Sequence, residues 1–451
     1  MWTSINQALN IIDNFVWGVP LMVLIIAGGL LLTIRLGLLQ IRKLPLALKW
    51  MLQNEEGGKG EISSFSALCT ALSATIGTGN IAGVATALTA GGPGALFWMV
   101  VAAFLGMATK YSEGLLAVKY RTVAEDGHSL GGPFYYIELG MGKKFKWLAK
   151  IFAFFGVCVG LFGIGTFSQV NGISSAVHGF FDPNDAFTVK ILPFLGEYSW
   201  SVVIASLILS FCVAAVLIGG VKRIASVSQI IVPFMAVIYF VFAVILICCN
   251  ITKVPAAFAT IVTAAFSPKA ITGGAVGSML IAMQKGVARG IFSNEAGLGS
   301  APIAAAAAQT NSPVRQGLVS MTGTFIDTII ICTLTGLSIV LTGAWQVEGL
   351  EGVQVTTYAF QHGLPFPAQF SSFILMLCLV FFAFTTILGW DYYSERCLEY
   401  LSGGNMKHVK IFRWIYILAV FIGPYMTVSA VWTIADIFNG LMAIPNMIAL
   451  F

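Results

Sequence analysis

The chain has 451 residues, of which 58% are hydrophobic and 10% are charged, and its formal net charge is +5. Ordinary soluble domains are about 25% charged, so this composition excludes a soluble enzyme and predicts an all-α polytopic membrane protein. Its apolar runs are long and continuous, which excludes the short alternating strands of an outer-membrane barrel. The basic residues gather in a few loops, so the positive charge gives no reason to expect a nucleic acid as a partner.

Apolar segments of about the 20 residues that a membrane helix needs recur along the whole chain. They predict eleven spans, at 15–39, 63–90, 93–120, 147–178, 200–219, 225–250, 270–298, 315–342, 368–394, 409–427 and 429–451. No cleavable signal peptide is expected, because the first apolar run follows Asp13 without a basic flank and is long enough to span. The last run has no polar flank, which suggests a trimmed C-terminus.

The loop charges predict the orientation of these spans. The loops of one side carry the basic residues Arg42, Lys43, Lys49, Lys59, Arg121, Lys143, Lys144, Lys146, Lys222, Arg223, Arg315, Arg396, Lys407, Lys410 and Arg413. The loops of the other side carry Asp182, Asp185, Glu197, Glu348 and Glu351, with Lys190, Lys253 and Lys269. By the positive-inside rule the basic side is cytoplasmic. We therefore expect a multi-pass protein of the plasma (inner) membrane, with its N-terminus outside and its C-terminus in the cytoplasm.

The second span contains a glycine-rich segment at 73–83, Ser-Ala-Thr-Ile-Gly-Thr-Gly-Asn-Ile-Ala-Gly, that should interrupt its helix. Three glycines lower the helix propensity, and three hydroxyls and an asparagine supply oxygen ligands. Close helix packing is the alternative explanation, and Gly79 with Gly83 has the spacing for it. Packing does not explain Thr75, Thr78 and Asn80 in the same stretch. Unpaired backbone in a bilayer is costly, so a ligand-binding break is the favoured interpretation.

The seventh span carries a second glycine-rich segment at 271–278, Ile-Thr-Gly-Gly-Ala-Val-Gly-Ser, which predicts a second break. Without the first span, ten spans remain, and both breaks then fall in the first helix of a set of five. This predicts a LeuT-type inverted repeat of five plus five helices, with one additional N-terminal helix. The chain then divides into the additional N-terminal helix with its cytoplasmic loop at 1–62, the first five-helix repeat at 63–250 and the second, inverted repeat at 251–451. Broken helices in matching positions are the sequence sign of a secondary transporter's binding site.

Other polar residues within the spans are candidates for the same site. Gln169 has an amide that suits an amino acid, or else makes a structural hydrogen bond. Thr385 and Thr386 offer two hydroxyls to a hard cation, or else bond back to their own helix. Asp327 should be buried and hydrogen-bonded, and could relay a proton or sodium. Lys110 with Glu113, and Lys285 with Arg289 and Glu295, are interpreted as structural or gating pairs. No catalytic triad is recognisable, so the chain is not expected to be an enzyme.

Several long motifs resemble those of one known family. Thr78-Gly79-Asn80-Ile81-Ala82-Gly83-Val84-Ala85-Thr86 leads into Gly91-Gly92-Pro93-Gly94-Ala95-x-Phe97-Trp98-Met99, and Gly131-Gly132-Pro133 and Phe292-Ser293-Asn294-Glu295-Ala296-Gly297-Leu298-Gly299-Ser300-Ala301 follow. Together they resemble the alanine or glycine:cation symporters, also called sodium:alanine symporters, over essentially the whole chain. The resemblance implies a member of the LeuT-like superfamily that imports a small neutral amino acid, alanine or glycine, with Na+ as the co-transported ion.

The resemblance also implies roles for individual residues. Substrate would be held by Thr78, Gly79, Asn80 and Gln169, with Gly273, Gly274, Gly277 and Ser278 of the second segment, and Phe167 and Trp390 would limit the size of its side chain. One sodium site would use carbonyls near Ser73 and Ile76 with the Thr385 and Thr386 hydroxyls, and a second would lie near Thr75 and Asn80. A proton-coupled transporter of the same fold, with Asp327 as its titrating group, is the alternative, and a channel is a weaker one.

Overall fold

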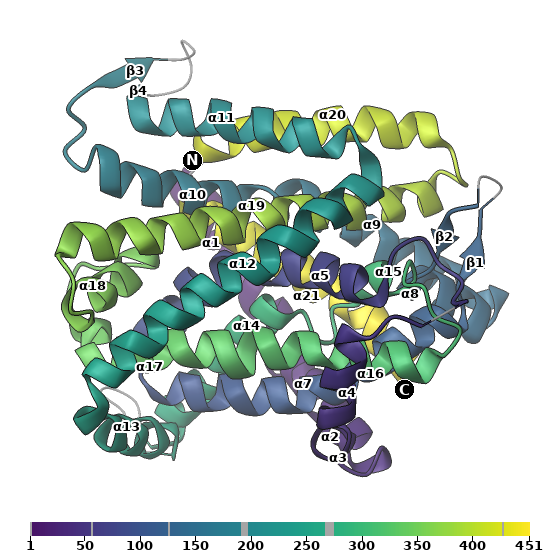
Figure 1. The fold of residues 1–451 in the computed structure, drawn as a ribbon, viewed down its shortest axis with the longest axis horizontal. Helices are drawn as coiled ribbons and strands as arrows, with labels where there is room; N and C mark the ends of the chain where they lie inside the picture. The colour runs from purple at the N-terminus through teal and green to yellow at the C-terminus, as the bar shows by residue number, and fades with distance from the viewer. Residues whose placement is uncertain (1, 56, 125–126, 191–196, 267–274, 426–427) are drawn as a thin grey trace.

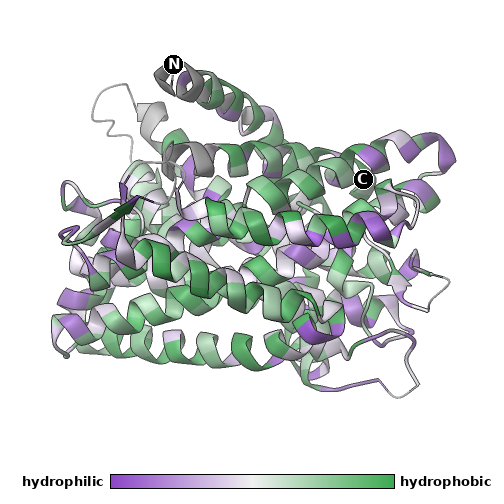
Figure 2. Ribbon diagram, turned by 90° about the horizontal axis from the view of Figure 1, so that it is seen from above, coloured by the Kyte–Doolittle hydropathy of each residue, from purple (hydrophilic) through white to green (hydrophobic). Residues whose placement is uncertain are grey.

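The structure is a computed structural model that describes residues 2–55, 57–124, 127–190, 197–266, 275–425 and 428–451. Most of its helices lie side by side along the long axis of the molecule (Figure 1). Hydrophilic residues gather at the two ends of these helices and hydrophobic residues lie between them (Figure 2). This distribution matches a bundle whose middle is covered by lipid and whose ends face water.

The first half of the chain is helical except for two short antiparallel hairpins. Its helices are α1 (Trp2–Val16), α2 (Val19–Arg35), α3 (Leu39–Arg42), α4 (Leu44–Leu52), α5 (Ser64–Thr75), η1 (Gly79–Gly83), α6 (Val84–Gly91), α7 (Gly94–Lys119), α8 (Pro133–Tyr135), η2 (Tyr136–Gly140), η3 (Lys143–Phe145), α9 (Lys146–Phe162), α10 (Phe167–Phe181), α11 (Trp200–Leu217) and α12 (Gly220–Cys249). The hairpins pair β1 (Thr122–Val123) with β2 (Ser129–Leu130), and β3 (Thr188–Lys190) with β4 (Glu197–Ser199).

In the second half, the regular structure of the described residues is helical. Its helices are η4 (Ile251–Lys253), α13 (Val254–Phe266), α14 (Ala275–Asn294), α15 (Ala301–Ala305), α16 (Pro313–Thr324), η5 (Phe325–Cys332), α17 (Thr333–Thr342), η6 (Ala344–Gln346), α18 (Val353–Gly363), α19 (Ala368–Leu401), α20 (Met406–Ile422), η7 (Gly423–Tyr425) and α21 (Val428–Leu450). Among the described residues, three segments, η1, η2 and η5, are π-helical, a conformation that often marks functional sites.

The described residues contain seven helices that are long and apolar enough to cross a membrane: Gly94–Lys119, Lys143–Phe181, Trp200–Leu217, Gly220–Cys249, Pro313–Thr342, Ala368–Leu401 and Thr433–Leu450. The bent pair Ser64–Thr75 and Gly79–Gly91 raises the number to eight. The described residues are therefore mostly helical, as predicted, with several membrane-capable helices and two short hairpins. The eleven spans and the five-plus-five repeat stay predictions, since α2 and α20 have 17 residues each and part of 270–298 lies outside the description.

The helices α11 and α12 form the most lipid-exposed part of the bundle. Only 33% of the apolar window of α11 and 28% of that of α12 is buried within the protein. Large side chains such as Phe211 and Ile230 are exposed on them. In water such a surface would cause aggregation, whereas in a bilayer it needs no cover.

The predicted interruption of the second span is confirmed. The helix α5 ends at Thr75, the helix resumes as η1 at Gly79, and the two parts are bent by 52°. We call residues 76–78, between these helices, the first break. It is buried on all sides, and polar side chains from α10 and α19 reach it.

Of the predicted second interruption at 271–278, residues 271–274, with Gly273 and Gly274 among them, lie outside the described residues. Gly277 and Ser278 belong to the first turn of α14, so these two residues are helical and not unwound as expected. A further interruption follows at the other end of this helix. The helix α14 ends at Asn294 and α15 begins at Ala301. We call residues 295–300, between them, the second break. Glu295, Gly297 and Gly299 in this break all have positive φ, which a helix cannot accommodate.

Candidate functional site

The first break is held open by side chains that replace helical hydrogen bonds. The N–H of Gly77 donates to Oδ1 of Asn80 at 2.9 Å, and the N–H of Thr78 donates to Oε1 of Gln169 at 3.0 Å. The hydroxyl of Thr386 lies within hydrogen-bond distance of two carbonyls, that of Ile76 at 3.2 Å and that of Phe382 in its own helix at 2.9 Å. The break is therefore satisfied from its own next turn, from α10 and from α19.

Close packing of α19 against α5 brings Thr386 to the break. A Cβ on Gly389 would lie only 2.8 Å from the backbone nitrogen of Ala74, so glycine is needed at this contact. The free carbonyls at the C-terminus of α5 give this end of the helix a partial negative charge. Together with the Thr386 hydroxyl they form an oxygen-rich position that suits a small hard cation.

The other hydroxyls predicted at the cation sites point back to their own helices. Thr385 donates to the carbonyls of Phe381 and Phe382, both at 3.0 Å. Ser73 donates to the carbonyl of Thr70, and Thr75 to those of Ala71 and Leu72. The structure therefore brings Thr386 and Ile76 together, but it places the Thr385 hydroxyl away from the break. The Ser73 and Thr75 hydroxyls donate within α5, so only their oxygen lone pairs and their backbone carbonyls are available to a cation.

Gln169 and Thr78 lie where an amino acid could be held. A Cβ on Gly77 would lie 2.5 Å from the Thr386 hydroxyl and 2.9 Å from Oε1 of Gln169, so Gly77 lies between both side chains. The hydroxyl of Thr78 is buried and has no hydrogen-bond partner among the described residues. It is thus available to a ligand. Gly79 faces the end of α14, where a Cβ would lie 3.3 Å from Phe292 and Ser293.

Asp327 ties the two broken helices together. Its Oδ1 accepts from Asn80 Nδ2 at 2.8 Å, and its Oδ2 accepts from the hydroxyls of Ser293 at 2.8 Å and Thr328 at 2.7 Å. The prediction that Asp327 is buried and hydrogen-bonded is confirmed. The Asn80 amide is already bonded to Asp327 and to the Gly77 N–H. Its role in this arrangement is therefore to hold the backbone of the first break.

The two aromatic residues predicted to limit the size of the substrate have different surroundings. Trp390 is fully buried, and its indole N–H donates to Oε1 of Glu295 in the second break at 2.8 Å. Phe167 packs against Ala419 and Gly423, at the far end of α20 and beyond it. It lies two residues before Gln169 on α10, and residues two apart on a helix face in nearly opposite directions. Phe167 therefore points away from Gln169, whereas Trp390 reaches the second break.

Three buried carboxylates lie around the two breaks. Glu113, Glu295 and Asp327 are all 0% exposed, and Lys110, at 3% exposed, interacts electrostatically with all three. The sequence analysis treated Glu113 and Glu295 only as structural or gating groups. The signal that could have found them is their position, since an acid within a span is a functional candidate by default. Together these charges favour bound cations at the centre of the molecule.

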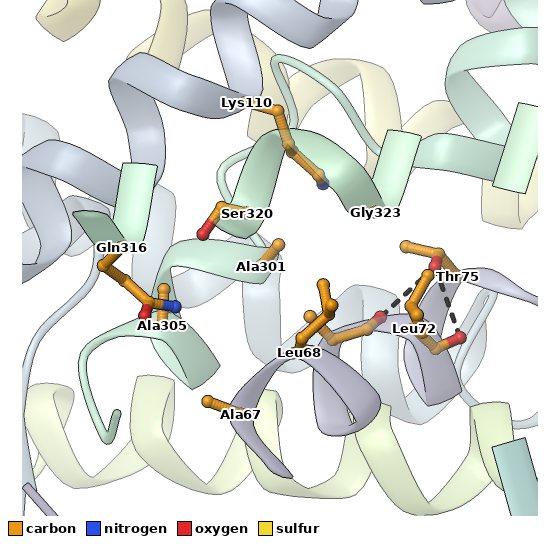
Figure 3. A pocket seen from close by; sticks show the side chains of 11 residues that line it. Ala67, Leu68, Leu72, Thr75, Lys110, Ala301, Ala305, Gln316, Ser320 and Gly323 are labelled. Atoms are coloured by element: carbon orange, nitrogen blue, oxygen red, sulfur yellow. Dashed lines mark hydrogen bonds between the residues drawn. The ribbon is translucent and has the colours of Figure 1, made fainter. Parts of the chain in front are cut away.

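Below the first break is a small enclosed cavity of about 10 Å³, roughly the space of one water molecule. Figure 3 shows Thr75 of α5, Lys110 of α7, and Gln316 and Ser320 of α16 around it. The Lys110 ammonium points into this space and has no hydrogen-bond partner among the described residues. A larger hollow of about 300 Å³ lies at the end of the bundle, among Tyr135, Glu138, Lys146, Glu399 and Tyr400.

Comparison with known proteins identifies the family. The family model described as the sodium:alanine symporter family matches residues 2–451. The sodium/alanine symporter AgcS of Methanococcus maripaludis is 46% identical over 449 residues, which cover 98% of this chain and 93% of the relative. An uncharacterized transporter of Haemophilus influenzae is 55% identical over 448 residues, covering 99% of this chain and 93% of the relative. The amino-acid carrier protein AlsT of Bacillus subtilis is 36% identical over 451 residues, covering 100% and 90%. The chain therefore belongs to the sodium:alanine symporter family, a family of membrane transporters with sodium as the co-transported ion.

Proposed function

We propose that this protein imports alanine together with sodium across the plasma (inner) membrane by alternating access, with glycine as a second substrate. The observation that carries the proposal is the first break, where Gln169 and Thr386 reach the same unwound turn from two different helices. One of them suits an amino acid and the other a cation, so both ligands would bind within one turn of backbone. The name of AgcS, a sodium/alanine symporter, supports the same pair of ligands.

In this proposal the sodium ion binds at the C-terminal end of α5. Its ligands are the carbonyls of Ser73 and Ile76 and the hydroxyl of Thr386. Thr385 supports this turn through its own helix, and a second cation near Thr75 and Asn80 would use backbone oxygens or the lone pairs of the Thr75 hydroxyl. Alanine binds beside it, between the first break and the end of α14. Thr78, Gly79 and Gln169 hold its charged groups, and Trp390 bounds its methyl group.

The proposed architecture is the LeuT-type inverted repeat of five plus five helices, preceded by residues 1–62. Support comes from the two broken helices, which face each other at Gly79 and Ser293. The proposed orientation has the C-terminus in the cytoplasm. The contacts between the basic loops support this orientation. The Arg121 guanidinium donates to the carbonyls of Lys59 and Thr310, which brings three predicted cytoplasmic loops together at one end of the bundle.

The test is uptake of labelled alanine into proteoliposomes under a sodium gradient, a proton gradient or neither. The proposal expects uptake with the sodium gradient alone. Proton-driven uptake would instead favour the second candidate, a proton-coupled transporter. The observation behind this candidate is the buried Asp327. A precedent is the putative sodium/proton-dependent alanine carrier protein YrbD of Bacillus subtilis, which is 37% identical over 457 residues.

The sodium site is tested by comparing the two neighbouring threonines. Thr386→Ala removes a ligand hydroxyl from a desolvated cation, so the sodium concentration for half-maximal uptake should rise about tenfold. Thr385→Ala is the matched control, because its hydroxyl is directed to its own helix, and it should change this value less than about threefold. Equal effects of both variants, or none from Thr386→Ala, would remove Thr386 from the site.

A further inference from the structure

The second break has a backbone shape that binds anions. The φ angles of Glu295, Gly297 and Gly299 are +56°, +89° and +79°, so left-handed residues alternate with ordinary ones. Such alternation turns successive N–H groups toward one concave side, an arrangement known as a nest. The N–H groups of Gly297 and Gly299 converge on the same atom, Oε1 of Glu113, at 3.1 Å each.

Glu113 comes from α7 and fills this nest with a carboxylate of the chain itself. Its Oε1 also accepts from Nδ2 of Asn446 on α21 at 2.7 Å. The same Asn446 nitrogen donates to the backbone carbonyl of Gly297 at 2.9 Å, and the Tyr136 hydroxyl donates to Oδ1 of the Asn446 side chain. A single carboxylate oxygen therefore joins α7, α21 and the second break.

A packing role alone does not account for a carboxylate at this place. Glu113 is fully buried, and its second oxygen, Oε2, has no hydrogen-bond partner among the described residues. Burying such a group is costly, and an apolar residue of similar size would pack without that cost. What only an anion supplies is charge-assisted hydrogen bonding to several N–H groups that would otherwise be unpaired.

The shape of the nest determines where neighbouring functional groups lie. Glu295, its first left-handed residue, accepts from the Trp390 indole and from the Ser300 hydroxyl. Ser293, two residues earlier, bonds to Asp327 and lies against Gly79 of the first break. If the nest closed up into helix, the contacts of Glu295 would move, because a helical turn would rotate Glu295 away from α19.

We propose that Glu113 is a positioning residue that holds the second break in its unwound form and thereby sets the affinity of the site for alanine. The part about affinity rests on the proposed function, which puts alanine between the two breaks. The part about backbone shape does not depend on it. The charge of Glu113 acts through the peptide groups of Gly297 and Gly299 and does not touch the substrate.

The test is Glu113→Gln, which keeps the shape of the side chain and removes its charge. Hydrogen bonds to a neutral oxygen are roughly half as strong, so the alanine concentration for half-maximal sodium-driven uptake should rise about tenfold or more while the maximal rate changes less than about threefold. Glu138→Gln is the matched control. Glu138 bonds to Lys146 and Tyr400 at the end of the bundle, and its replacement should leave both values unchanged.

A second measurement separates this inference from the proposed function. Hydrogen exchange of the peptide that contains residues 295–300, measured in detergent, should become at least tenfold faster in Glu113→Gln than in Glu138→Gln. This readout needs no substrate, so it stands even if the protein transports something other than alanine. Unchanged exchange in Glu113→Gln would overturn the proposal, and so would unchanged half-saturation in a protein that transports alanine normally.

The partner of Glu113 provides a further check. Asn446→Ala removes one donor and keeps the carboxylate, so it should accelerate exchange in the same peptide by a smaller factor. This variant also serves if Glu113→Gln fails to fold. Both residues act on Gly297, so their effects on hydrogen exchange should overlap, and the double variant should accelerate exchange by less than the two single effects combined. Full additivity would mean that the two residues act independently.

Discussion

Gln169 and Thr386 show how much of this site depends on single side chains. Each satisfies one backbone group of the first break, and each is fully buried or nearly so. A buried group that loses its partner keeps the whole desolvation cost, about 1–3 kcal/mol. Replacing either residue should therefore weaken ligand binding strongly, although each side chain makes only one hydrogen bond to the first break among the described residues.

Gln169→Leu leaves the Thr78 N–H unpaired and removes the amide from the proposed alanine site. The half-saturating alanine concentration should rise about tenfold or more. Gln169→Glu should restore function only in part, since an ionised carboxylate can accept from Thr78 but cannot donate to a substrate carboxylate. Uptake assays measure both, with Gln361→Leu as the control at a half-buried glutamine that bonds only to Ser372. Normal uptake by Gln169→Leu would make this residue a packing residue.

Trp390 and Phe167 can be separated by the size of amino acid that each lets in. Trp390→Leu should open space beside the second break, so valine and leucine should begin to compete with labelled alanine uptake. Phe167→Leu should not have this effect, because its ring packs toward Ala419 and Gly423. Sharp size selection needs a rigid wall, since an adaptable apolar pocket discriminates by only about 1–3 kcal/mol per methylene. Competition by leucine in Phe167→Leu alone would reverse these assignments.

At the scale of elements, the half-helices α5 and α15 are fastened to each other where they leave the bundle. Ile62 and Ala308 form a parallel bridge, with the Gln309 N–H donating to the Ile62 carbonyl at 2.7 Å. The Arg121 guanidinium donates to the carbonyls of Ala308 and Lys59, both at 2.8 Å. Nearby, the hydrogen bond from the Thr310 hydroxyl, with help from the Asn311 N–H and Arg315, lowers the pKa of Glu55.

Arg121→Gln should loosen this fastening, because a neutral amide cannot replace a planar guanidinium that serves several carbonyls. Cys69, buried on α5, is a native reporter of that loosening. In a background without the other cysteines, its alkylation by maleimide should become about tenfold faster in Arg121→Gln. Lys150→Gln, at an exposed position, should leave the rate unchanged. If Arg121→Gln also leaves it unchanged, the guanidinium does not hold α5 in place.

At the scale of the whole molecule, both parts of the second broken helix are tied to neighbours. On the α15 side the tie is Arg121. On the α14 side, Arg289 forms a bidentate ion pair with Asp436 of α21, with N–O distances of 3.1 and 2.5 Å. The Trp17 indole, between α1 and α2, donates to the Asp436 carbonyl at 2.7 Å. These ties hold both parts of the second broken helix against neighbouring segments of the chain.

The sequence by itself determined the class of the protein and the place of the first break. A chain with 10% charged residues and repeated long apolar runs can bury its surface only in lipid. Gly77, Gly79 and Gly83 lower the helix propensity so far that the interruption is a local property. The burial and hydrogen bonding of Asp327 also followed from sequence, since an acid in the middle of a span must find partners. The motifs were long enough to indicate the family.

Only the tertiary structure decided which side chains meet. Which of Thr385 and Thr386 faces α5 depends on the rotation of α19 about its axis, and this rotation is fixed by the contact of Gly389 with Ala74. The rotation of α10 likewise decides that Gln169 faces the first break while Phe167, two residues earlier, faces away from it. The second break lies at 295–300 because Glu113 and Asn446, far away in the sequence, supply the partners for its unwound backbone.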